Sequence, residues 1–394
     1  MPHRILVVDD EADLEILIRQ KFRKQIRDNE YDFSFAANGV EALTKLAGQP
    51  DIGLVLSDIN MPEMDGLTLL HRINELKNPA LKAVIVSAYG DMDNIRVAMN
   101  RGAFDFLTKP IDFSDLETTI AKTLEQLAVL RQATKDREQL LSVRNDLNTA
   151  ARIQQSILPQ TFPPFPERSE FDIYAKMTPA KEVGGDFYDF FFIDHDRLAF
   201  VIGDVSGKGV PAAIFMAVSR TLLKAIASQV VNPGESLRRI NSMLIPESGG
   251  RMFVTIFYGV LNTRTGEVQF SFGGHNPPYI KRVGGPIERL NHESGFLLGM
   301  LDDMEYDVHK ILLRPGDTIL LYTDGVTETM NGSQELFEES RLENVLRRLD
   351  GVPLRDMLDG INGELMEFAA GAPQADDVTM LALRYNGKPN PDVP

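Results

Sequence analysis

The chain has 394 residues, 43% of them hydrophobic, so it can form two or three domains with substantial cores. Its formal net charge of -16 argues against binding to nucleic acid, because neutralising phosphates needs clustered Lys and Arg. Cysteine is absent, which excludes disulfides, thiolate zinc sites and a cysteine nucleophile.

The first apolar run, residues 4–8, is short and ends in two acids, unlike a signal peptide. No run of about 18 uninterrupted apolar residues follows, so we expect a cytoplasmic protein without a membrane span. Residues 4–8, 52–57 and 83–87 read as buried parallel strands, with helical periodicity between them. This pattern predicts a doubly wound α/β domain.

In a doubly wound sheet the functional crevice lies at the carboxyl ends of the strands. Asp9, Asp10, Asp58, Ser87 and Lys109 all fall at or just beyond such ends. Asp9 and Asp10 can hold Mg²⁺ beside a nucleophilic Asp58, and Lys109 can supply a positive charge to the transferred oxygens. Each residue alone is more simply a loop carboxylate or a surface lysine, but together they favour a phosphoryl-acceptor site.

Four segments carry a resemblance over roughly the first 115 residues: Val8-Asp9-Asp10-Glu11, Ser57 to Gly66, Val86-Ser87-Ala88 and Leu107-Thr108-Lys109-Pro110. They resemble the receiver domain of two-component response regulators. The resemblance implies phosphorylation of Asp58 by a sensor histidine kinase, with Mg²⁺ in a pocket that includes Asp9, Asp10 and Asn60. It also implies a switch made by Ser87, Phe106 and Lys109. Phe106 replaces the commoner Tyr, so an inward swing would bury its ring without a hydroxyl hydrogen bond.

Residues 114–157 contain neither glycine nor proline, and apolar residues recur at steps of three and four, which predicts one long helix. Its apolar seam slips between residues 133 and 139. Because a lone helix cannot cover such a seam, we expect a parallel homodimer through this linker. The alternative is that the helix packs onto its own domains. Prolines at 159, 163, 164 and 166 end the helix.

These patterns divide the chain into a receiver domain (1–115), a helical linker (116–160), a second domain (161–387) and a disordered tail (388–394). The second domain has strand patterns at 198–202, 253–260, 266–272 and 318–322. Helices are expected at 211–228, around 235–243 and at 338–348. We therefore predict an α/β/β/α sandwich with the helices outside.

Four acidic motifs in this domain follow or open predicted strands, and their key acids are Asp186, Asp204, Asp324 and Asp376. Carboxylates and backbone carbonyls are the ligands that Mg²⁺ and Mn²⁺ prefer, so the motifs indicate a metal-dependent hydrolase. We expect Asp204 to bridge two metals beside the carbonyl of Val205, with the other three acids completing the set. Two metals would acidify a bridging water for attack on a phosphomonoester.

Five motifs follow one another in this domain: Gly-Gly-Asp-Phe-Tyr-Asp, Gly-Asp-Val-Ser-Gly-Lys-Gly, Gly-Gly-His-Asn-Pro-Pro, Tyr-Thr-Asp-Gly and Asp-Asp-Val-Thr. Their order resembles that of the PPM (protein phosphatase 2C) serine/threonine phosphatases, in particular their stage-II sporulation and stress-regulator subgroup. The resemblance implies two Mn²⁺ or Mg²⁺ ions, uncertain ligand roles for Asp189 and Asp377, and a structural or substrate-side role for His275. It also implies a regulatory element at residues 151–159 and a phosphorylated anti-sigma antagonist as substrate.

The sequence thus predicts a response regulator in which phosphorylation of Asp58 controls a phosphoserine/phosphothreonine protein phosphatase in sigma-factor partner switching. We expect the signal to reposition residues 153–158 against the catalytic core. Two alternatives stay open. One is a catalytically inactive adaptor that binds a sigma or anti-sigma factor under receiver control, and the other is a dimeric scaffold that sequesters the antagonist.

Overall fold

The structure is a computed structural model that describes residues 2–88, 91–290 and 295–387. The chain separates into two compact units, Met1–Val143 and Arg144–Pro394. The division falls inside one helix, α6 (Phe113–Ile157), which confirms the long helix expected over 114–157. The tail predicted to be disordered, 388–394, lies outside the described residues.

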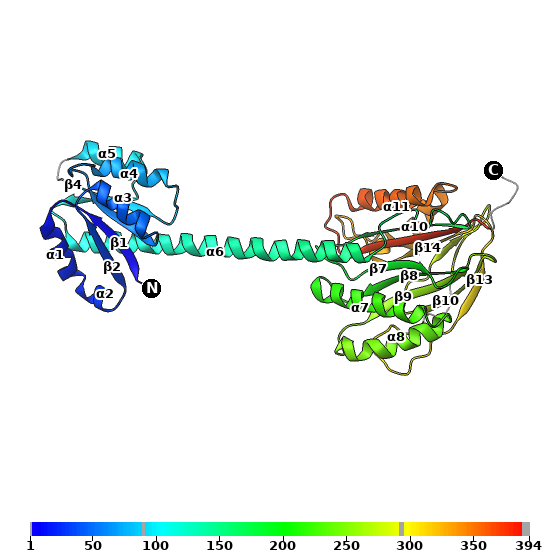
Figure 1. Ribbon diagram of the computed structural model, residues 1–394. Coiled ribbons are helices and arrows are strands. Elements are labelled where there is room, and N and C mark those ends of the chain that lie inside the picture. Colours follow the sequence, from blue (N-terminus) through cyan, green and yellow to red (C-terminus); the bar gives the residue numbers. More distant parts are fainter. Residues whose placement is uncertain (1, 89–90, 291–294, 388–394) are drawn as a thin grey trace. The chain divides into compact units, whose positions relative to one another are not determined.

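The first unit is built on a five-stranded parallel sheet with the order β2-β1-β3-β4-β5, as predicted for a doubly wound domain (Figure 1). Its strands are β1 (His3–Val8), β2 (Tyr31–Ala36), β3 (Ile52–Asp58), β4 (Lys82–Ala88) and β5 (Asp105–Lys109). Its helices besides α6 are α1 (Ala12–Lys21), α2 (Arg23–Arg27), α3 (Gly39–Gly48), α4 (Gly66–Glu75) and α5 (Met92–Asn100). β2 and β5 were not predicted from the sequence.

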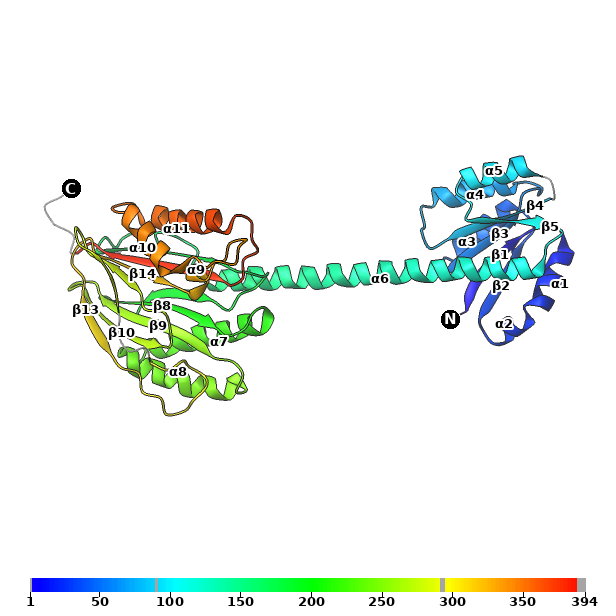
Figure 2. The same cartoon turned by 180° about the vertical axis from the view of Figure 1, so that it is seen from behind.

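A hydrophobic core fills each face of this sheet, because successive strand residues point to opposite sides. Leu6 and Val8 belong to the core that includes residues of α3, α4 and α5. Ile5 and Val7 belong to the other core, which the beginning of α6 completes with Leu116, Ile120, Leu124 and Leu127. Figure 2 shows α3, α4 and α5 together on one side of the sheet. The first turns of α6 are therefore part of the receiver's own core.

The second unit contains two five-stranded sheets, with the orders β13-β10-β9-β8-β7 and β12-β11-β14-β15-β6. The first sheet comprises β7 (Phe187–Phe192), β8 (Arg197–Val205), β9 (Val254–Asn262), β10 (Glu267–Gly273) and β13 (His309–Leu312). The second comprises β6 (Phe171–Thr178), β11 (Tyr279–Lys281), β12 (Ile287–Arg289), β14 (Thr318–Tyr322) and β15 (Val378–Tyr385). Every pairing in both sheets is antiparallel.

Helices cover both outer faces of the sandwich, as predicted: α7 and α8 lie on one side, and α10 and α11 on the other (Figure 1). Their bounds are α7 (Val210–Ala227), α8 (Pro233–Ser248), α9 (Asp324–Thr327), α10 (Glu338–Arg348) and α11 (Leu354–Ala369). The largest core lies between the sheets and includes Ala175 of one and Phe200 of the other.

Among the described helices, α7 is the one whose length and composition would allow it to cross a membrane, with a mean hydropathy of 1.5 over 18 residues. Arg220 and Lys224 interrupt its apolar sequence. Its inner face is formed by Ala212, Phe215 and Met216, which are buried in one hydrophobic cluster with residues of the first sheet. Packing against the first sheet therefore accounts for its apolar composition.

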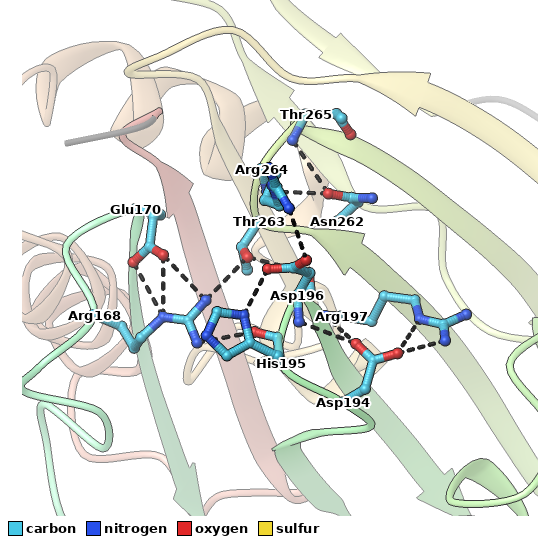
Figure 3. Close-up of polar contacts among 10 residues, drawn as sticks. All are labelled: Arg168, Glu170, Asp194, His195, Asp196, Arg197, Asn262, Thr263, Arg264 and Thr265. Carbon is cyan, nitrogen blue, oxygen red and sulfur yellow. Dashed lines mark hydrogen bonds and ion pairs between the residues drawn. The ribbon is translucent and has the colours of Figure 1, made fainter. Parts of the chain in front are cut away.

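A polar network fastens the turns at one end of the sandwich (Figure 3). Arg168, just before β6, donates to the Glu170 carboxylate at 3.1 and 3.2 Å and to the carbonyl of His195 at 2.9 Å. It also donates to Thr263 Oγ1 at 3.1 Å, and its guanidinium lies 4.5 Å from the ring centre of Phe192. One side chain thus ties the segment before β6 to the β7–β8 and β9–β10 turns.

Candidate functional sites

The structure brings Asp9, Asp10 and Asp58 together at the carboxyl ends of β1 and β3. One carboxylate oxygen of each lies within 4.8 Å of the others. Among the described residues, this is the group of three acids that lies this close together. Three hard oxygen donors at this spacing fit a small divalent cation. Asp58 is buried, Asp9 half-buried and Asp10 exposed, so the site opens to solvent on one side.

Lys109 is the cationic centre of this pocket. Its Nζ lies 2.8 Å from Asp58 Oδ2, 3.0 Å from Asp9 Oδ2 and 3.0 Å from Glu11 Oε1. Partial burial disfavours the charged amine, but the hydrogen bonds to Asp58 and Asp9 outweigh this and raise the pKa of Lys109. Burial in turn raises the pKa of Asp9, against hydrogen bonds that lower it. Lys109 is thus held charged beside Asp58.

The other receiver residues predicted to act lie around this pocket. Ser87 is fully buried and its Oγ lies 3.4 Å from Asp91 Oδ2. Phe106 is 37% exposed on β5, and Asn60 is exposed just beyond β3. The Asp58 carboxylate also accepts a hydrogen bond from the Ile59 N–H at 2.6 Å. Glu11, which pairs with Lys109, is a member of this pocket that the sequence did not predict to act.

In the second domain, the four predicted metal-binding acids lie where strands of both sheets end or begin. Asp186 precedes β7 and Asp204 lies near the end of β8, and the pairing of Phe187 with Gly203 makes them neighbours. Asp324 follows β14 and Asp376 precedes β15, and these strands are also paired. One acidic pair thus comes from each sheet.

Two side chains, Thr323 and Asp377, connect the acidic pairs across the sandwich. Thr323 Oγ1 donates to Asp186 Oδ2 at 2.7 Å, which links the end of β14 to the start of β7. Asp377 accepts from the backbone N–H of Gly185 at 2.6 Å and of Ala180 at 2.7 Å. A Cβ at Gly184 would lie 2.3 Å from the Asp377 carboxylate, so only glycine allows this approach. Asp377 therefore holds the loop that carries Asp186.

The acids of this site repel one another. Burial, followed by the charge of Asp324, raises the pKa of Asp204 to about 7. Burial, with Asp204 and Asp377, raises the pKa of Asp186 well above its usual value. Burial, with Glu328 and Asp376, also raises the pKa of Asp324. A cluster of carboxylates with raised pKa values is the environment that bound cations would relieve, so the residues fit the divalent ions that the motifs imply.

Two ion pairs involve acids of the motifs, one of them deeply buried and the other partly exposed. Asp189 is 1% exposed and its Oδ2 lies 2.7 Å from Arg220 Nη2 of α7, so its charge is already paired. We therefore leave Asp189 out of the proposed ligand set. Lys208, which precedes α7, lies 2.9 Å from Asp376 Oδ2.

The end of α6 contacts the loop that carries Asp186. The Gln154 side chain is buried, donates from Nε2 to the Gly184 carbonyl at 2.6 Å and accepts from the Gly184 N–H at 3.0 Å. Leu158 is part of the core between the sheets, and Tyr188 donates to the Pro159 carbonyl at 2.8 Å. The predicted regulatory segment thus touches the loop that carries Asp186 through Gln154, a residue that sequence reasoning did not single out.

His275 is a buried residue of the second domain rather than a member of the acidic cluster. Its Nε2 lies 3.2 Å from the Tyr322 carbonyl and its Nδ1 lies 3.0 Å from Thr255 Oγ1. A carbonyl can only accept, so Nε2 carries the proton and Nδ1 accepts from Thr255. Thr255 is the sheet partner of Asp204, and Tyr322 lies two residues before Asp324. His275 therefore links β9, the neighbour of the strand that carries Asp204, to the end of β14 just before Asp324.

Protonation of His275 should destabilise the second domain. Complete burial lowers the pKa of His275 to about 4, below the usual value of 6.5 for an unfolded chain. The unfolded state therefore binds more protons between these values, and stability is complete above about pH 6.5 and falls as the pH drops toward 4. At 1.36 kcal/mol per unit, the loss is about 3 kcal/mol.

Urea denaturation at several pH values would measure this effect. The full chain should lose stability between pH 6.5 and 4, and His275→Gln should lose less over this range. His195→Gln is the matched control, since His195 has 89% of its side chain exposed. Identical pH slopes for the wild type and His275→Gln would contradict the assignment.

Fold and sites together define the class of protein: a receiver domain with a phosphoacceptor pocket, followed by a PP2C-type sandwich with an acidic site between its sheets. The sequence profile of the response regulator receiver domain matches residues 5–121, and that of stage II sporulation protein E (SpoIIE) matches residues 194–386. Sporulation initiation phosphotransferase F of Bacillus subtilis is 34% identical over 125 residues, which are 32% of this chain and 95% of that protein.

The second domain has its own relatives. Protein IcfG of Synechocystis sp. is 32% identical over 271 residues, 62% of this chain but 42% of IcfG. Phosphoserine phosphatase RsbU of Bacillus subtilis is 28% identical over 245 residues, 61% of this chain and 70% of RsbU. The SiaA-PP2C domain of Pseudomonas aeruginosa has the same fold, with a TM-score of 0.56 and 24% identity over 62% of this chain and 98% of that one. The chain belongs to the response regulators, with a SpoIIE-type phosphatase domain joined to its receiver domain.

Proposed function

We propose that the second domain removes phosphate from phosphoserine or phosphothreonine in a protein substrate, using two Mn²⁺ or Mg²⁺ ions, and that phosphorylation of Asp58 controls its rate. The observation that carries this proposal is the convergence of Asp186, Asp204, Asp324 and Asp376 from two facing sheets, with a pKa of about 7 for Asp204. When bound, the two ions would activate a shared water and screen the phosphoryl oxygens.

The chain's own residues have separate tasks in this proposal. Asp204 would help to hold both ions, with the Val205 carbonyl and Asp186 completing the ligands of one and Asp324 and Asp376 those of the other. A Cβ at Gly185 would lie 2.7 Å from the Val205 carbonyl oxygen, so that oxygen faces the loop that carries Asp186. Lys208, already beside Asp376, would offer its charge to the anionic substrate.

For the partners, we propose a sensor histidine kinase as the source of phosphate for Asp58 and a phosphorylated anti-sigma antagonist as the substrate. Two relatives, RsbU and RsbP of Bacillus subtilis, carry the name phosphoserine phosphatase, which supports the substrate class. The four acids are all present, which favours an enzyme over an inactive adaptor.

The test is phosphate release from a phosphoserine peptide by the full chain, with Mn²⁺, with Mg²⁺ and after chelation. The proposal predicts turnover that requires a divalent ion and that does not occur after chelation. No turnover with either ion, with the receiver phosphorylated or unphosphorylated, would overturn it and favour the adaptor.

For control, we propose that the receiver acts through α6. The first turns of this helix complete the receiver core through Leu116 and Ile120, and its last turns hold Gly184 through Gln154. A shift or rotation of the helix would thus move the loop that carries Asp186. The coupling requires that phosphorylation stabilise one helix position over another, because only differential contacts shift an equilibrium.

Replacing Gln154 with alanine should weaken the metal site. The change removes both hydrogen bonds to Gly184 and leaves buried backbone groups without partners, which costs about 1–3 kcal/mol. Partners of this kind around metal ligands typically contribute about 10- to 100-fold in metal affinity or activity. A titration of phosphatase activity with Mn²⁺ would show a higher requirement for Gln154→Ala. The exposed neighbour Gln155→Ala is the control, and equal Mn²⁺ curves for the two variants would contradict the role of Gln154.

We also propose a homodimer through the middle of α6. The helix is exposed throughout residues 128–146, and this stretch includes Leu140 at 72%, Val129 at 66% and Leu141 at 52% exposure. A second copy of the helix would cover these side chains. Light scattering of the full chain should give twice the mass of the 44.0 kDa protomer, whereas a protomer mass at micromolar concentration would contradict the dimer.

A further inference from the structure

An apolar cavity of about 220 Å³ lies beside Asp376 in the second domain. One wall is the end of α11, and the facing walls are the segment after α9 and the segment that leads into β15. The residues that characterise it are Met330, Leu365, Met366, Ala369, Asp376 and Val378. Gly325, the neighbour of Asp324, also lines it. The cavity is thus continuous with the site at which we place the metals.

The lining of this cavity offers carbon and sulfur to a ligand. Met366 is 70% and Met330 41% exposed, whereas Leu365 and Val378 form a buried floor. Two of the polar side chains around it form hydrogen bonds within the protein. Gln374 donates to the carbonyls of Thr178 and Asp376 at 2.8 and 2.7 Å, and Thr329 donates to the Gly325 carbonyl at 2.7 Å. Two exposed methionines over an apolar floor suit an adaptable contact with another apolar side chain.

The volume of the cavity and its position beside Asp376 limit the kinds of ligand that it can bind. The volume is below the 300–1,000 Å³ that is typical of pockets for whole small molecules, and it suits a single large side chain. A phosphoserine whose phosphate is bound at the ion that Asp324 and Asp376 would hold carries its neighbouring residues about 3.8 Å further along the chain per step. Such residues would pass over the cavity, because Asp376 belongs to both places.

We propose that this cavity binds an apolar side chain of the phosphoprotein substrate within a few residues of the phosphoserine. The inference rests on the proposed function and narrows its substrate class to phosphoserine segments flanked by a large apolar residue. The metal site would recognise the phosphate that all such substrates share, and the cavity would select among them.

The test compares two synthetic peptides with the full chain in Mn²⁺. Both carry one phosphoserine, which is flanked by glycine alone in the first and by leucine at the three positions on either side in the second. The wild type should prefer the leucine peptide by about 10-fold or more in kcat/KM, the range that one apolar pocket provides. Met366→Gln makes the wall polar and Ala369→Phe fills the cavity, so both should bring this preference close to one.

Glu367→Gln is the matched control, because Glu367 is exposed on the same turn of α11 and does not line the cavity. It should keep the wild-type preference. Equal kcat/KM values for the two peptides in the wild type, or an unchanged preference in both cavity variants, would overturn the cavity proposal and leave the proposed function intact. If neither of the two peptides is hydrolysed, the proposed function is overturned and the cavity proposal with it.

Discussion

Asp204→Asn is expected to remove the phosphatase activity of the second domain. Asp204 lies near the end of β8, beside Asp186, and burial with the charge of Asp324 raises its pKa to about 7. Asparagine keeps the shape of the side chain but cannot carry the negative charge that a bridging ligand needs. Loss of an outer partner of a ligand already costs about 10- to 100-fold, so loss of the bridging ligand should exceed 100-fold.

The measurement is phosphate release from a phosphoserine peptide, together with calorimetric titration of Mn²⁺ into the second-domain site. Asp204→Asn should lose both turnover and tight metal binding. Asp302→Asn is the control, since Asp302 is an exposed acid of the same domain. Turnover by Asp204→Asn within tenfold of the wild type would exclude Asp204 as a ligand.

The second large effect is expected at the receiver, where Asp58→Asn should abolish phosphorylation. Asp58 is 6% exposed, and its Oδ2 lies 2.8 Å from Lys109 Nζ. Aspartate can attack a phosphoryl group because it carries a charged oxygen, and the neutral amide of asparagine cannot. The full chain incubated with acetyl phosphate and Mg²⁺ should gain one phosphoryl group, and the variant none.

Intact-mass spectrometry before and after incubation measures this gain. The control is Asp28→Asn, which replaces an exposed acid of the same domain and should be phosphorylated like the wild type. A phosphoryl group retained on Asp58→Asn would show that another residue is the acceptor.

Much of the architecture could be predicted from local sequence patterns. The absence of glycine and proline over 114–157 predicted α6 to within one residue at its start, and α10 was predicted at its observed bounds. α11 was not predicted, although it covers the second sheet and lines the cavity beside Asp376. The pairing of β6 with β15 joins Phe171 to Tyr385, and no local pattern reports a contact over such a distance in the chain.

The candidate sites divide in the same way. The pattern of a strand followed by an acid predicted the positions of Asp9 and Asp58 in the receiver domain and of Asp204 and Asp324 in the second domain. What those acids contact could not be read from the sequence. The partner of Asp189 is Arg220 on a separate helix, and Asp377 accepts from the N–H of Gly185. The sequence does not distinguish Gln154 from other glutamines of the helix, because its two hydrogen bonds to Gly184 depend on the tertiary structure.

The measurement that tests the account most directly is Mn²⁺-dependent phosphate release from a phosphoserine peptide by the wild type and Asp58→Asn, each with and without acetyl phosphate. We predict that acetyl phosphate changes the rate of the wild type, in either direction, and leaves the rate of Asp58→Asn unchanged. Equal rates for the wild type with and without a fully phosphorylated receiver would contradict control of the phosphatase by Asp58.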